Sequence, residues 1–148
     1  MASKNIRGIT IQIGADVTQL DKGLKTADKS IKQVQNELKE VEKALKLDPG
    51  NTELVAQKQQ LLAEQVEKTS DKLSMLKNAQ TQVEEQFRSG KITAEQYRAF
   101  QRELTNTESE LRSLRREQTA YNAEQNTARQ TSERLSKQLD TLAEGLKK

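Results

Sequence analysis

The spacing of apolar residues in the first third of the chain is the feature that most constrains its fold. Apolar residues recur there at alternating intervals of three and four positions without a miss: Val17, Leu20, Leu24, Ala27, Ile31, Val34, Leu38, Val41 and Leu45. This spacing places a narrow apolar stripe, a heptad seam, along one side of a helix, and a second helix must cover it. The sequence therefore predicts a helix over about residues 17–46, with Asp16 as its cap and another helix as its partner.

A second helix is predicted over about residues 52–88. The first helix ends at Pro49-Gly50, because proline disfavours helix at the preceding residue and glycine permits a turn. The second seam comprises Leu62, Val66, Leu73, Leu76, Val83 and Phe87, with polar interruptions at Thr69 and Gln80. Since only a short turn joins the two helices, we expect them to pair antiparallel as a hairpin over residues 16–88.

A third and longest helix is predicted over residues 93–148. Gly90 ends the second helix, and Thr93 with Gln96 three residues later forms a capping box. The strongest seam residues of this helix are Phe100, Leu104, Leu111, Leu114, Leu135, Leu139 and Leu142. Between Gln118 and Ser132 the seam is mostly polar, which predicts a weakly packed stretch, and we expect the helix to continue beyond residue 148.

The N-terminal arm, residues 1–15, carries a strand signal. Ile9, Ile11 and Ile13 alternate with polar residues between Gly8 and Gly14. Because a single strand leaves its backbone groups unpaired, we predict that it pairs with another copy of the chain or with a different protein. The alternative is a disordered tail. The fold expected overall is all-α: an elongated antiparallel hairpin plus a long coiled-coil helix, preceded by a short β-strand.

Composition excludes several classes of chemistry. The chain has no histidine and no cysteine, so it cannot use an imidazole base, a thiol nucleophile, a disulfide or a zinc site built from these residues. Acidic pairs such as Glu84-Glu85 point apart on a helix, which indicates solvated surface. We therefore expect no enzymatic activity, cofactor or metal. The net charge of +3 is spread along the chain, which disfavours specific nucleic-acid binding, and no apolar run is long enough to cross a membrane.

Four stretches resemble the N-terminal region of tail tape measure proteins from long-tailed bacteriophages and prophages, especially those of Gram-positive hosts. They are IRGITIQIGADVTQLDKGLK, LKLDPGNTELVAQKQQLL, EQFRSGKITAEQYRAFQREL and the heptad-bearing helices that link them, which together cover most of residues 6–115. The resemblance implies a structural protein that lies in several copies along the tail tube lumen and sets tail length. It further implies tail tube protein and tail assembly chaperones as partners, first in the host cytoplasm and then in the virion.

Two functional hypotheses follow from these observations. The first is a self-associating structural fragment of a tape measure protein, in which the seam residues join copies of the chain. The second is a cellular coiled-coil scaffold or adaptor that binds partner proteins through an exposed apolar stripe.

Overall fold

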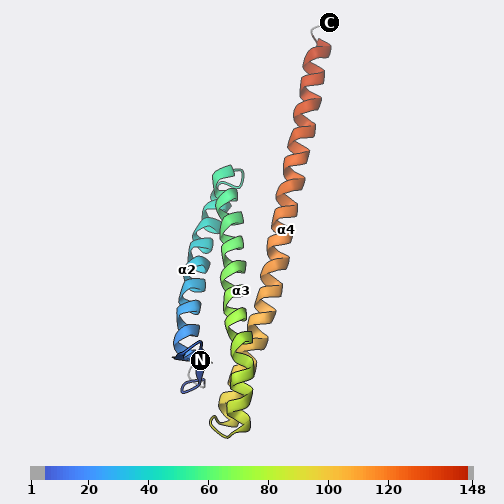
Figure 1. The fold of residues 1–148 in the computed structure, drawn as a ribbon. Coiled ribbons are helices and arrows are strands. Elements are labelled where there is room, and N and C mark those ends of the chain that lie inside the picture. The colour runs from blue at the N-terminus through green and yellow to red at the C-terminus, as the bar shows by residue number, and fades with distance from the viewer. Residues whose placement is uncertain (1–5, 147–148) are drawn as a thin grey trace.

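The computed structural model describes residues 6–146 and contains three helices preceded by a small sheet. The elements are β1 (Thr10–Ile13), β2 (Asp16–Gln19), α2 (Leu20–Leu47), α3 (Thr52–Arg88) and α4 (Ala94–Leu146). Helices α2 and α3 form the predicted antiparallel hairpin, and α4 returns along α3 and continues far beyond the α2–α3 turn (Figure 1). The all-α fold with a short N-terminal β element is thus confirmed. Residues 1–5 of the predicted arm and 147–148 of the predicted third helix lie outside the described residues.

Local side-chain caps explain where α3 and α4 begin. The Asn51 side chain accepts a hydrogen bond from the Leu54 amide at 3.1 Å, which satisfies one of the free amides in the first turn of α3. At the start of α4, the Gln96 amide donates to Thr93 Oγ1 at 3.0 Å and the Thr93 amide donates to Gln96 Oε1 at 2.7 Å. This reciprocal pair is the predicted capping box.

The N-terminal strand finds its partner within the chain, so the prediction of a partner in another molecule is wrong. β1 pairs antiparallel with β2, and Ile13 lies opposite Asp16 at the closed end of the hairpin. Gly14 and Ala15 form the two-residue turn, with a φ of +62° at Gly14. Turns with glycine first and positive φ at that position match the twist of paired strands. The second strand, Asp16–Gln19, occupies the segment that the heptad spacing predicts as the cap and first turn of the first helix.

Helix α2 consequently begins at Leu20, three residues later than predicted. Asp16 is not a helix cap, and Val17 is not a helical seam residue: it lies opposite Gln12 in the sheet and is 69% exposed. The Leu20 amide donates to the Ile9 carbonyl at 3.0 Å, which ties the start of the helix to the hairpin. An interval of three residues from Val17 to Leu20 fits a heptad, but it does not distinguish a helix from a strand that runs into one.

Two separate apolar clusters form the core. The basal cluster lies near the β-hairpin and the α3–α4 turn; its buried members are Ile6, Ile9, Ile11, Leu20, Leu24, Leu76, Ala79, Val83, Ile92, Ala99 and Phe100. The apical cluster lies near the α2–α3 turn; its buried members are Val34, Leu38, Val41, Leu61 and Leu62, with Tyr121 of α4 packed against them. All three helices contribute to both clusters, which makes the covered part of the molecule a three-helix bundle.

Candidate self-association surface

Most of the predicted seam is buried inside the chain itself. The buried seam residues are Leu20, Leu24, Ile31, Val34, Leu38 and Val41 of α2, Leu62, Leu76 and Val83 of α3, and Phe100 and Leu111 of α4. Leu45, Val66, Leu73, Leu104 and Leu114 are half-buried. Phe87 is 39% exposed, and its ring stacks on Tyr97 with 4.3 Å between centroids. These residues close the three-helix bundle, so their apolar surface is not free to join copies of the folded chain.

The seam emerges uncovered at the far end of α4. Leu135, Leu139, Leu142 and Leu146 are 54%, 66%, 64% and 89% exposed, and we call these four residues the leucine ridge. Helix α4 has 53 residues whereas the antiparallel α3 has 37, so α3 does not extend alongside this region. Figure 1 shows the last turns of α4 projecting alone beyond the α2–α3 turn. Leu135, Leu139 and Leu142 are therefore the predicted self-association residues of α4 that remain available to a partner.

The charged residues of this projecting segment all avoid the ridge. With Leu139 at heptad position a and Leu142 at d, the flanking positions e and g carry Ser136, Gln138, Ala143 and Gly145. The charged side chains between residues 130 and 146 occupy only the outward positions b, c and f: Glu133, Arg134, Lys137, Asp140 and Glu144. An apolar stripe with small or neutral flanks suits close contact with a second helix.

A layer of ion pairs around the buried Lys72 separates the two clusters of the core. Lys72 of α3 is 6% exposed, and its ammonium lies 2.6 Å from Asp28 of α2 and 3.3 Å from Glu103 of α4. Burial by itself lowers the pKa of Lys72, but the hydrogen bond to Asp28 and the charge of Glu103 outweigh burial and raise the pKa above its ordinary value. Two buried threonines, Thr69 and Thr107, belong to the same helices. Lys72 thereby links all three helices at one level, an arrangement that sequence reasoning missed.

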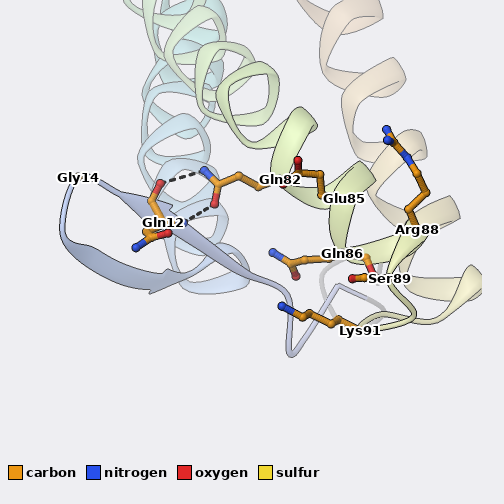
Figure 2. A pocket seen from close by; sticks show the side chains of 8 residues that line it. All are labelled: Gln12, Gly14, Gln82, Glu85, Gln86, Arg88, Ser89 and Lys91. Atoms are coloured by element: carbon orange, nitrogen blue, oxygen red, sulfur yellow. Dashed lines mark hydrogen bonds between the residues drawn. The ribbon is translucent and has the colours of Figure 1, made fainter.

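Two glutamines of α3 cover the outer edge of the β-hairpin. Gln82 both accepts a hydrogen bond from the Gln12 amide and donates to the Gln12 carbonyl, the latter at 2.9 Å (Figure 2). Gln86 donates to the Thr10 carbonyl. Because these amides imitate the pairing of a neighbouring strand, they protect an edge that would otherwise present free backbone groups. We call Gln82 and Gln86 the glutamine clamp; an open groove of about 890 Å³ lies beside it.

The remaining predicted site residues have structural roles. Ile9 and Ile11 are buried in the basal cluster, whereas Ile13, at the tip of the hairpin, is 61% exposed. Pro49 and Gly50 lie in the α2–α3 turn as predicted. Gly90 follows α3 with a φ of +75°, a conformation that favours glycine.

Comparisons with protein-family models, with curated proteins and with solved structures give no match to this chain. Within residues 6–146, none of the helices combines the length and the apolar character needed to cross a lipid bilayer. In the same residues, no group of acidic side chains is gathered closely enough to hold a metal ion.

Proposed function

We propose that this chain is a structural coiled-coil segment of a phage tail tape measure protein, which self-associates and contributes its helical length to the length of the tail. The observation that carries the proposal is the length of α4, whose 53 residues continue as a single helix beyond the α2–α3 turn (Figure 1). The proposal is supported by the resemblance of four stretches, which cover most of residues 6–115, to the N-terminal region of tape measure proteins. The proposed location is the tail lumen, after assembly in the host cytoplasm.

The physical basis of such a role is the constant rise of a helix. Each residue adds about 1.5 Å whatever its side chain, so that the 53 residues of α4 span about 80 Å. A protein built from long helices therefore converts residue number directly into distance. The partners that this role requires are further copies of the chain, the tail tube protein and tail assembly chaperones.

The test is the length of tails assembled around a lengthened protein. Two additional copies of residues 118–131, inserted in register after residue 131 in the phage gene, add 28 residues and preserve the heptad pattern and the leucine ridge. Electron micrographs of the tails should then show an increase of about 42 Å. The double variant Arg115→Lys with Arg116→Lys, which keeps the residue number, should give tails of the parent length. Tails of unchanged length around the lengthened protein would refute the proposal.

The leucine ridge would also suit a cellular scaffold that binds a helical partner. This second candidate makes a different prediction for the same insertion, because a scaffold sets no particle length. It also requires that the ridge bind a different protein in preference to a copy of itself. The oligomeric state of the purified chain therefore distinguishes it from the first candidate.

A further inference from the structure

We infer that the free chain forms an antiparallel dimer through the leucine ridge, with Leu139 of one copy packed against Leu142 of the other. The inference rests on the self-association in the proposed function, but not on the tape measure role. The ridge continues, at the same spacing of three and four residues, the stripe of α4 that α3 covers around Leu104 and Leu111. A second helix is therefore the partner that fits the leucine ridge, and it would pack on α4 as α3 does farther along the same stripe.

The uncharged flanks of the ridge favour a second copy of the same segment over a charged partner. The flanking residues Ser136, Gln138, Ala143 and Gly145 carry no charge, so the ridge offers no ionic group with which to select a different, charged partner. Two identical ridges can meet without placing like charges against each other. The small side chains at positions 143 and 145 also permit close approach of the two helices.

The position of the α2–α3 hairpin decides how the two copies are oriented in the dimer. Helix α3 lies on the seam side of α4 up to the α2–α3 turn, where Pro49 and Gly50 border the same cavity as Gln125 and Ala128. In a parallel pair with facing ridges, both hairpins would lie at the same level between the two α4 helices. They would keep those helices farther apart than the roughly 8–10 Å of packed helices. In an antiparallel pair the two hairpins lie at opposite ends, and the ridges can meet.

The spacing of the leucines then fixes the register. In antiparallel coiled coils, position a of one helix packs beside position d of the other. Leu139 at position a meets Leu142 at position d of the second copy, and Leu146 meets Leu135 in the same way. All four leucines of each copy are thereby buried against leucines. Copies that line a tail in one direction could not keep this pairing, so the dimer is a form of the free chain that must separate before the copies align.

Mass and shape measured together test the dimer and its orientation. Light scattering should give twice the chain mass, and small-angle scattering should give a maximum dimension of about 140 Å, since the two α4 helices overlap only at their ends. A parallel dimer would be about 80 Å long. A dimer of that length would overturn the antiparallel arrangement and leave self-association standing, whereas a monomer at all concentrations would overturn both.

Substitutions inside and outside the leucine ridge test whether Leu139 and Leu142 form the dimer interface. The double variant Leu139→Gln with Leu142→Gln should raise the dimer dissociation constant by about 100-fold or more, because it removes the two central layers. Leu47→Gln, at an exposed leucine outside the ridge, is the matched control and should leave the constant unchanged. Circular dichroism should show the same helicity in all three proteins. If the double variant dimerises as tightly as the parent, the ridge is not the interface.

The register is tested with single cysteines, since the chain has none of its own. A mixture of Leu139→Cys and Leu142→Cys chains should form mainly the mixed disulfide under oxidation. Predominant disulfides between identical variants would contradict the antiparallel register.

Discussion

Replacement of Lys72 by methionine should destabilise the bundle by about 3 kcal/mol, although it keeps an unbranched side chain of similar size. The Lys72 side chain is 8% exposed, and the Glu103 side chain that it contacts at 3.3 Å is 14% exposed. At that distance the attraction is about 5 kcal/mol for an effective dielectric constant near 20, before the cost of desolvation is subtracted. Methionine leaves the largely shielded Glu103 carboxylate without its counter-ion, and this unpaired charge is the main source of the loss.

Asp28 should contribute much less than Glu103. Its side chain is 47% exposed, so water can replace the lost contact, and pairs of this kind are worth about 1 kcal/mol or less. The variant Asp28→Asn should therefore cost at most about 1 kcal/mol. Glu103→Gln in the Lys72→Met background should restore part of the lost stability, because it removes the unpaired charge.

Thermal unfolding followed by circular dichroism measures these changes. A loss of about 3 kcal/mol lowers the midpoint of a domain of this size by about 6–12 °C. Lys77→Met, at an exposed lysine on the same helix, is the matched control and should shift the midpoint little. The reasoning would be refuted if Lys72→Met matched the parent, or if Glu103→Gln changed stability equally in both backgrounds.

Three further predictions concern other contacts. Gln82→Ala should speed hydrogen exchange of the β1 amide that its side chain covers, whereas Gln80→Ala should not, because Gln80 bonds only within α3. Gly90→Ala should cost about 1 kcal/mol in denaturant titration, since φ is +75° there, while Gly50→Ala, with no positive φ and open space around its Cβ position, should be neutral. The raised pKa of Lys72 means that its contribution is complete below the ordinary value of 10.5 and is lost as pH rises through the higher folded value. The difference in unfolding free energy between the parent and Lys72→Met should therefore become smaller as the pH rises above 10.5.

Local signals were sufficient to predict the helices. The alternation of three and four residues, the Pro49-Gly50 breaker and the capping box at Thr93 each depend on neighbours within one or two turns of the chain. The predicted boundaries of α3, residues 52–88, agree with the structure for this reason. The error at the start of α2 arose where two local patterns overlap, since Val17 satisfies both the heptad spacing and a short strand.

Contacts between distant segments could not be predicted in the same way. Gln82 and Gln12 are 70 positions apart, and Lys72 and Asp28 are 44 apart, so no spacing rule relates them. Whether these side chains come into contact depends on the register in which the helices pack. That register is set by the burial of the whole apolar seam. The sequence did identify the ridge leucines as apolar seam residues. It could not indicate which part of the seam the chain would cover by itself.

The difference in length between α3 and α4 decides which part of the seam the chain covers by itself. Subtraction of the 37 residues of α3 from the 53 of α4 leaves 16 residues, or about 24 Å of helix, without a neighbour. Burial of four leucines on each copy, at about 1.5 kcal/mol per side chain, is worth about 12 kcal/mol in total, which exceeds the cost of bringing two chains together by only a modest margin. The ridge is therefore suited to a contact that forms and separates, while the buried clusters hold the bundle closed. One continuous stripe thus serves two purposes: permanent packing where α3 covers it and reversible association where α3 has ended.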